Sequence, residues 1–279
     1  MLPEMKWVCG LTAFIFSSSL IFAEPPAESK SPRFGERLEL SMSDGTRYTA
    51  LLTLPKKTDL PLPVLIVLGG FDTGEKSLEQ LPVDLNAIYA TVDYPYKAPN
   101  QRSFLADLKE IPEIKKAIHR VDLCVDALIE KLRIDPRVNK NRMIFAGASF
   151  GAPFAITAAV RNSEIDGILL IHAFGKVESA ITQQLVNKWE WWSYPIAFLL
   201  GHITWDYLAY KDPETEVRKL HSHQQVLNLY ATEDEQLPIQ SIQSLQTALS
   251  ESPAQVTSQK AEGGHLGPGK KEVFSSVIT

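Results

Sequence analysis

The chain has 279 residues, of which 44% are hydrophobic and 22% are charged, and its formal net charge is −5. This length and composition are typical of a globular protein of one or two domains, and they argue against collagen, coiled coil and extensive disorder. The negative charge, without a basic patch, argues against nucleic acid as a partner. The cysteines are Cys9 and Cys124 alone, so the sequence does not encode a disulfide-stabilised miniprotein.

Residues 1–23 are typical of an export signal. Lys6 precedes an apolar run from Trp7 to Phe22, and the small residue Ala23 precedes the polar, proline-rich sequence EPPAESKSP. The apolar run is shorter than the roughly 20 residues of a membrane-spanning helix. We therefore expect a cleaved signal peptide and export to the periplasm or the exterior, with retention as an N-terminal anchor as the alternative.

Residues 24–36 are expected to form a linker, and residues 37–279 a single domain. The domain opens with two strand-like runs, Arg37 to Leu40 and Tyr48 to Leu54. Between them lies the sequence Ser-Asp-Gly at positions 43–45, a strong turn signal. The pattern predicts a β-hairpin at the start of the domain.

Strands and helices alternate after this hairpin. Strands are expected at 64–68, 87–93, 143–146, 167–171, 226–230 and 255–259, and helices at 114–132, 152–160 and 239–249. Pro112 lies near the start of the longest helix, and the sequence Asp135-Pro136 follows its end. The alternation predicts an α/β fold, with a mainly parallel sheet and helices on both of its faces.

Residues 176–220 interrupt this alternation, because they separate two expected strands by far more than a usual crossover. They contain four of the five tryptophans of the chain: Trp189, Trp191, Trp192 and Trp205. Long insertions of this kind are typical of functional lids, so we expect a helical cap. Most of these rings are expected to pack the cap onto the domain, with one or two facing a pocket.

The sequence GASFG at positions 147–151 follows an expected buried strand and precedes an expected apolar helix. A serine on such a sharp strand-to-helix turn has a strained backbone, and small flanking residues allow the strand and the helix to approach each other. The turn presents the hydroxyl group of Ser149 at a helix N-terminus, which stabilises negative charge. The motif predicts Ser149 as a nucleophile; the alternative is a glycine-rich turn around an inert serine.

A serine hydroxyl needs a neighbouring base to take its proton, and the chain has six histidines. His265 lies in the glycine-rich sequence EGGHLGPG after the last expected strand, where a tight loop can present its ring, so we predict it as the base. His172, directly after an expected buried strand, is the alternative base. His221 and His223 form an H-x-H pair, a metal-binding pattern that lacks a third ligand in the neighbouring sequence.

The base needs a carboxylate to fix its tautomer and to stabilise the imidazolium ion. Asp234, in LNLYATEDEQLP, follows the strand expected at 226–230 and lies 31 residues before His265. That distance leaves room for one helix and one strand, and we predict Asp234 for this role. Glu233 and Glu235 remain alternatives, because the phase of the loop decides which carboxylate points inward.

The oxyanion of a tetrahedral intermediate needs two hydrogen-bond donors. One is expected to be the backbone N–H group of Phe150, the residue after the nucleophile. The other is expected in the loop that follows the strand at 64–68 and reads GGFDTG, because glycines allow the chain to approach a substrate closely. Either Gly70 or Phe71 could supply this group; a simple turn is the alternative.

Together these residues resemble those of the α/β-hydrolase superfamily. The sequence RIDPRVNKNRMIFAGASFGAP is similar to the region that leads into the nucleophile of dienelactone-hydrolase-like and prolyl-oligopeptidase-like members. Ala152 stands where many members have a second glycine, and the loop GGFDTG lacks the histidine that often precedes such glycines. The resemblance implies a twisted sheet of about eight strands with residues 176–220 as a cap, and an acyl-enzyme mechanism without metal or organic cofactor.

The expected function is that of a serine hydrolase, a carboxylesterase that acts on a small or medium acyl ester. A peptidase of the prolyl-oligopeptidase type is the second candidate, although the chain has no room for the propeller of those enzymes. A lipase or thioesterase is the third, supported by the tryptophan-rich insertion. A non-catalytic binding protein on the same fold is an alternative of another class, against which the complete set of three residues argues.

Overall fold

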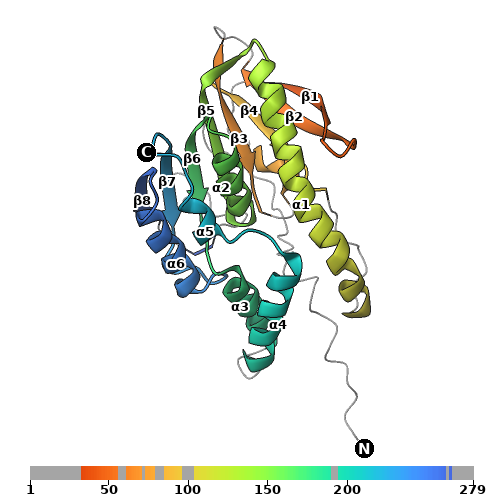
Figure 1. Cartoon of the computed structure of the whole chain (residues 1–279), viewed down its shortest axis with the longest axis vertical. Coiled ribbons are helices and arrows are strands. Elements are labelled where there is room, and N and C mark those ends of the chain that lie inside the picture. The colour runs from red at the N-terminus through yellow and green to blue at the C-terminus, as the bar shows by residue number, and fades with distance from the viewer. Residues whose placement is uncertain are drawn as a thin grey trace, which may run out of the picture.

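The computed structural model describes residues 33–55, 61–70, 73–78, 85–95, 104–189, 194–261 and 264–265 (Figure 1). These residues form an eight-stranded sheet in the order β1-β2-β4-β3-β5-β6-β7-β8. The strands are β1 (Arg33–Ser41), β2 (Arg47–Pro55), β3 (Leu62–Leu68), β4 (Ile88–Val92), β5 (Val138–Ala148), β6 (Ile165–Ile171), β7 (Gln225–Tyr230) and β8 (Gln255–Lys260). β2 pairs antiparallel with β1 and with β4, and all other neighbours pair parallel. The predicted hairpin and mainly parallel sheet are confirmed; the expected signal peptide lies outside the described residues.

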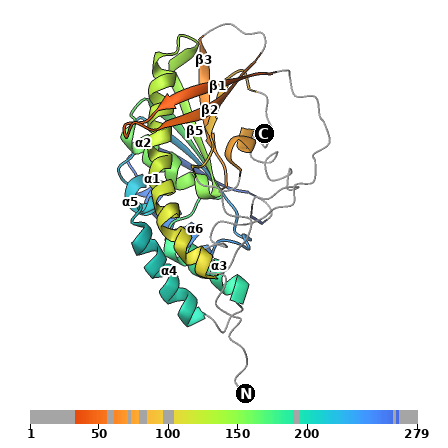
Figure 2. The same ribbon diagram turned by 90° about the vertical axis from the view of Figure 1, so that its right-hand side faces the viewer.

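Helices cover this sheet. They are α1 (Phe104–Ile134), α2 (Ala152–Arg161), α3 (Val177–Trp189), α4 (Tyr194–Leu208), α5 (Pro213–Val217) and α6 (Ile239–Ser250), with the short 3₁₀ helices η1 (Gly74–Leu78) and η2 (Ser149–Gly151). Buried residues of α1, α2, α5 and α6 share one large core with residues from one face of the sheet. Figure 2 shows α1 and α2 on that side, and η1 on the opposite side. Among the described residues, the α-helices of the large core thus lie on one face of the sheet, and η1 lies on the other.

The central strands β3 and β4 are buried on both faces, as their uninterrupted apolar sequences predict. Successive side chains of a strand point to opposite faces. Ile66 and Leu68 therefore belong to the large core under α1 and α2, whereas Leu65 and Val67 lie in a second cluster with Leu78 of η1. Burial on both faces fixes the position of these strands, and with it the start of the loops that follow their carboxyl ends.

Helix α1 is longer than its sequence pattern predicts. It begins at Phe104, and Pro112 lies inside the helix instead of near its start. The apolar spacing predicted only the part of the helix that packs on the sheet. The buried residues of that part are Ile114, Ile118, Val121, Val125, Leu128 and Leu132. The N-terminal part extends past the sheet (Figure 1). A proline removes one backbone hydrogen bond, but its fixed φ is compatible with helical backbone, so the helix continues through it. β1 and β5 also begin earlier than expected, at Arg33 and Val138.

The insertion at 176–220 contains α3, α4 and α5. Helices α3 and α4 pack against each other beyond the carboxyl ends of the parallel strands (Figure 1). Trp205 is partly buried against the core and its indole N–H group donates a hydrogen bond to Asp212 at 2.7 Å, as expected for a packing role. The side chains of Trp189, Trp191 and Trp192 lie outside the described part of the chain. None of the helices formed by the described residues has the length and apolar character needed to cross a membrane.

Candidate active site

Ser149 lies at the sharp turn between β5 and α2. Its φ is 50°, in the left-handed region that residues other than glycine rarely adopt. The turn is tight enough to need a glycine on each side of the serine. A Cβ atom at Gly151 would lie 2.1 Å from the carbonyl oxygen of Leu68, and one at Gly147 would lie 2.7 Å from the Cα atom of Ala152. Close contact between β3, β5 and α2 therefore explains the two glycines of GASFG.

The imidazole ring of His265 faces this serine. Ser149 Oγ lies 3.1 Å from His265 Nε2, although 116 residues separate the two in the sequence. Ser149 follows β5 and His265 follows β8, and the carboxyl ends of parallel strands meet at one edge of the sheet. His265 is only 5% exposed. The structure thus brings together the predicted serine and the predicted histidine in a site shielded from bulk water.

Asp234 lies in the loop after β7, and its side chain is fully buried. Its Oδ2 atom lies 2.7 Å from His265 Nδ1. Its Oδ1 atom accepts hydrogen bonds from the backbone N–H groups of Gln236 and Leu237, both at 2.9 Å. These two turn amides fix the carboxylate so that Oδ2 faces the imidazole.

The surroundings of Asp234 hold the pKa of its carboxyl group below the usual range. Burial acts in the opposite direction, because it destabilises a charge. The hydrogen bonds from His172 and His265, the charge interaction with His265 and the backbone N–H group of Gln236 outweigh burial. Asp234 is therefore ionised at neutral pH, and an ionised carboxylate only accepts hydrogen bonds. His265 must carry a proton on Nδ1, which in the neutral ring leaves the lone pair of Nε2 toward Ser149.

The two glutamates beside Asp234 take other positions. Glu235 Oε2 accepts a hydrogen bond from the backbone N–H group of His265 at 2.9 Å, so it holds the backbone of this loop and not the ring. Glu233 is exposed. Of the three neighbouring carboxylates, the predicted Asp234 is the one that contacts the imidazole.

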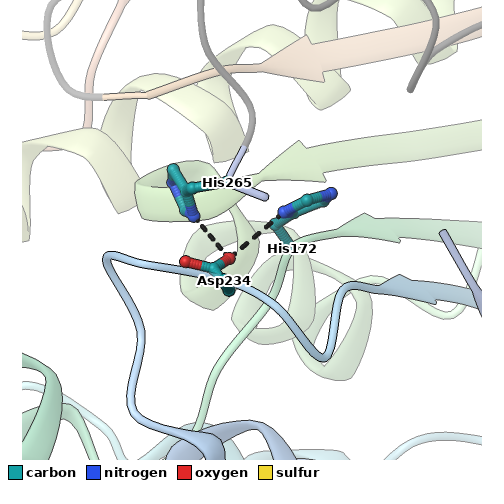
Figure 3. Close-up of side chains that lie close together, drawn as sticks. All are labelled: His172, Asp234 and His265. Atoms are coloured by element: carbon teal, nitrogen blue, oxygen red, sulfur yellow. Dashed lines mark hydrogen bonds and ion pairs between the residues drawn. The ribbon is translucent and has the colours of Figure 1, made fainter. Parts of the chain in front are cut away.

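A second imidazole, from His172, reaches the same carboxylate oxygen (Figure 3). His172 directly follows β6, and its Nδ1 atom lies 3.2 Å from Asp234 Oδ2. The rings of His172 and His265 are 5.5 Å apart and nearly perpendicular, at 87°. Within the described residues His172 Nε2 has no hydrogen-bond partner, so neither ring nitrogen contacts Ser149. The geometry therefore does not support His172 as the base. The contact between His172 and Asp234 was not predicted from the sequence. The position of His172 directly after a buried strand was the sequence feature that could have indicated it.

The loop expected to supply an oxyanion donor lies beside the serine turn, because β3 and β5 are paired neighbours. The carbonyl group of Gly69 accepts a hydrogen bond from the Tyr94 hydroxyl at 2.6 Å. The carbonyl group of Gly70 accepts two from Thr73, at 3.0 Å from the backbone N–H group and 2.6 Å from the hydroxyl. These bonds fix the carbonyl groups of both glycines. Phe71, the other candidate donor, lies outside the described residues.

Phe150, the residue after the serine, lies in η2 at the start of the helical segment. Its ring packs edge-on against Tyr94 at 5.5 Å and against Phe154 at 5.3 Å between ring centroids. Aromatic pairs in this geometry add to the stability gained by burial. The packing therefore holds the residue predicted to supply the first oxyanion donor.

Comparison with solved structures identifies enzymes of a single fold. An acetyl xylan esterase from Paenibacillus sp. R4 has a TM-score of 0.58 at 16% sequence identity, over 93% of this chain and 88% of the other. A dienelactone hydrolase-like promiscuous phosphotriesterase from metagenomic libraries has a TM-score of 0.55 at 12% identity, over 88% of this chain and 98% of its own. The chain has the α/β-hydrolase fold.

A prolyl endopeptidase contains the same α/β-hydrolase fold, with a TM-score of 0.58 at 17% identity. The match covers 91% of this chain but 38% of the endopeptidase chain. Comparison with protein-family models and with curated protein sequences gives no match. At such low identities the likeness establishes the fold, and the chemistry has to be argued from the site.

One group of described side chains in this α/β-hydrolase fold has ligand atoms close enough to surround a metal ion. It consists of His172, Asp234 and His265, whose ligand atoms lie within 4.8 Å of one another. The two Nδ1 atoms carry protons that they donate to the carboxylate, whereas a metal ligand needs an unprotonated nitrogen. Hydrogen bonding therefore accounts for this group. The H-x-H pair is not part of it, and His223 Nε2 bonds instead to the carbonyl group of Ser163 at 2.9 Å.

This arrangement has the parts that activate a nucleophile. A hydroxyl group lies at a strained turn, an imidazole lone pair faces it, and a buried carboxylate fixes the tautomer of that imidazole. Ser149 can transfer its proton to His265 as it attacks an electrophilic carbon. The imidazolium ion that results is stabilised by Asp234.

Proposed function

We propose that the protein is a serine hydrolase that cleaves carboxylic esters through an acyl-enzyme intermediate. One observation carries the proposal: the continuous path from Ser149 Oγ to His265 Nε2 at 3.1 Å, and from His265 Nδ1 to Asp234 Oδ2 at 2.7 Å. The order serine, aspartate, histidine along the chain is the one associated with the nucleophile-elbow turn. The esterases among the similarly folded enzymes support this reaction class.

In the proposed reaction, Ser149 Oγ attacks the ester carbonyl carbon while His265 Nε2 takes its proton. The tetrahedral intermediate then collapses: the proton passes to the alcohol oxygen, the alcohol leaves, and the acyl group remains bonded to Oγ. Water attacks the acyl carbon, with His265 again taking the proton and returning it to Oγ as the acid leaves. Asp234 remains ionised throughout and stabilises each imidazolium ion.

The negative oxygen of both tetrahedral intermediates needs N–H donors. We assign this role to the backbone N–H group of Phe150, and to that of Gly70 or Phe71. The support is positional: Phe150 follows Ser149 within η2, and Gly70 lies in the loop after the strand that pairs with the serine strand. Donors that follow the ends of two adjacent strands can converge on an oxygen bound near Ser149.

Labelling with a fluorophosphonate, which reacts with activated serine hydroxyl groups, tests the nucleophile. We expect covalent labelling of the wild type, and its loss in Ser149→Ala and His265→Ala. Ser250→Ala and His119→Ala change exposed residues of the same types on α6 and α1, and these matched controls should be labelled as the wild type is. A folded wild type that is not labelled would favour the non-catalytic binding protein.

A panel of substrates tests the bond that is cleaved. Turnover of acetyl, butyryl and palmitoyl nitrophenyl esters is measured beside turnover of a proline amide. We expect the highest kcat/KM on the short esters. Turnover of the proline amide alone would replace the esterase with a peptidase, and a preference for the palmitoyl ester would replace it with a lipase or thioesterase.

A further inference from the structure

Asp234 accepts more hydrogen bonds than the proposed reaction requires. Its Oδ1 atom accepts two from backbone N–H groups, and its Oδ2 atom accepts two from imidazole rings, His265 at 2.7 Å and His172 at 3.2 Å. Each carboxylate oxygen has two lone pairs, so all four acceptor positions of this buried group are occupied. Among the two side-chain donors, His172 has no role in the proposed proton transfers.

His172 occupies a position that is unfavourable for a side chain with a purely structural role. It is 1% exposed, its φ is 48°, and within the described part of the chain its Nε2 atom has no hydrogen-bond partner. A buried polar atom without a partner and a left-handed backbone each destabilise the folded state. The side-chain hydrogen bond that His172 does make goes to Asp234. Unfavourable local features of this kind cluster at functional sites.

We propose that His172 is a positioning residue of the active site: it holds Asp234 and, by sharing Oδ2, weakens the pull of this carboxylate on His265. The inference rests on the proposed function. Two N–H groups that share one oxygen each receive a weaker interaction than a single N–H group would. Asp234 therefore interacts less strongly with the imidazolium form of His265 than it would without His172.

The groups around the rings of His172 and His265 determine what the pH dependence of kcat/KM reports. Asp234 lies between the rings, Ser149 faces Nε2 of His265, and Glu235 contacts the backbone N–H group of His265. No other ionisable side chain among the described residues forms a hydrogen bond to either ring. Because Asp234 stays ionised well below neutral pH, the acid limb of kcat/KM reports protonation of the imidazole pair.

Two substitutions separate the effect of the hydrogen bond between His172 and Asp234 from the effect of the imidazole ring itself. In His172→Asn the amide nitrogen takes the place of Nδ1 and still donates to Asp234, whereas His172→Ala leaves no donor. We expect His172→Ala to lower kcat on the preferred ester about 10-fold with KM unchanged, the effect of losing one hydrogen bond to a charged group. The acid limb of kcat/KM should move to higher pH by roughly 0.5 to 1 unit. His172→Asn should recover most of kcat and return the limb to its wild-type position.

A purely structural His172 gives a different result. Both variants then lose thermal stability in parallel, while kcat and the acid limb of the folded protein keep their wild-type values, and this result overturns the proposal. If His172→Ala does not fold, His172→Gln replaces it, because the longer side chain carries its amide toward the position of Nε2 and away from Asp234. Failure of the proposed function can be distinguished from failure of the His172 proposal alone. In that case the wild type itself shows no turnover that depends on Ser149, and that result overturns both proposals.

Discussion

The two halves of the site are held by different forces. The turn that carries Ser149 is defined by steric contact between backbones, since a Cβ atom at Gly151 would meet the carbonyl oxygen of Leu68 at 2.1 Å. The loops that carry Asp234 and His265 are defined by hydrogen bonds among themselves. Steric fit within a turn affects whether the chain folds, whereas loop hydrogen bonds affect how the folded site reacts. We therefore expect substitutions in the turn to change stability and substitutions in the loops to change catalysis.

The largest expected effect belongs to the loops. Asp234→Asn replaces an acceptor with an amide that can donate to Nδ1, which favours the tautomer with its proton on Nε2 and removes the lone pair that faces Ser149. We expect kcat on a short ester to fall roughly 10⁴-fold, measured on protein that is folded at neutral pH. Glu233→Gln, a change at the exposed neighbour, is the control and should keep the wild-type kcat. A loss smaller than about tenfold would show that the carboxylate is not the partner of the base.

The largest expected effect on stability belongs to the turn. Gly151→Ala places a Cβ atom against backbone atoms that cannot rotate away, and we expect it to lower the free energy of unfolding by about 3 kcal/mol. Gly70→Ala is the matched control. Its Cβ atom would have Thr73 Cγ2 as its nearest neighbour, at 3.9 Å, an ordinary contact, so we expect a change within about 0.5 kcal/mol. Equal denaturant midpoints for the two variants would remove the steric explanation of the motif.

The same contrast explains how much of the fold was predictable from the sequence. Apolar runs such as 64–68 and the helical spacing of 114–132 identified buried elements, because buried positions are occupied by apolar residues that recur at the period of the element. The first turns of α1, before Pro112, lie on the part of the helix that extends past the sheet, where packing on the sheet imposes no such period. Element order and sheet type were therefore predictable, and the ends of elements were not.

The residues of the site were likewise predictable from the sequence, whereas some of the contacts between them were not. GASFG predicted the serine turn because its steric requirement is local, and the glycine-rich loop and the acidic loop predicted His265 and Asp234 because each follows a strand at one edge of the sheet. The sequence could not predict that His172 and His265 share one oxygen, or that Glu235 holds the backbone of the histidine loop. Those contacts depend on the relative placement of loops that are distant in sequence.

A smaller effect should appear in the pH dependence of stability. The pKa of Asp234 is lowered in the folded state, so between the folded and unfolded values the unfolded chain binds a proton that the folded chain does not. The stabilisation is present above about pH 4, the usual pKa of an aspartate, and is lost as pH falls toward the folded value. Below pH 4 we expect the free energy of unfolding to fall more steeply in the wild type than in Asp234→Asn, by up to about 1.4 kcal/mol per pH unit. Urea titrations at several acid pH values measure this difference; Glu233→Gln should follow the wild type, and parallel slopes for all three proteins would contradict it.

The smallest expected effect concerns Glu235, whose carboxylate accepts the backbone N–H group of His265 at 2.9 Å. Glu235→Ala leaves the ring contacts of His265 in place but loosens the loop behind the ring, so we expect kcat/KM to fall about 3-fold to 10-fold, the effect of one hydrogen bond of ordinary strength. Glu235→Gln keeps an oxygen acceptor and should recover most of that loss, while Glu233→Ala should cause none. A loss in Glu235→Ala as large as that in Asp234→Asn would mean that backbone support of the loop and the carboxylate partner of the base are equally important. The distinction between a residue that holds the loop and one that holds the ring would then fail.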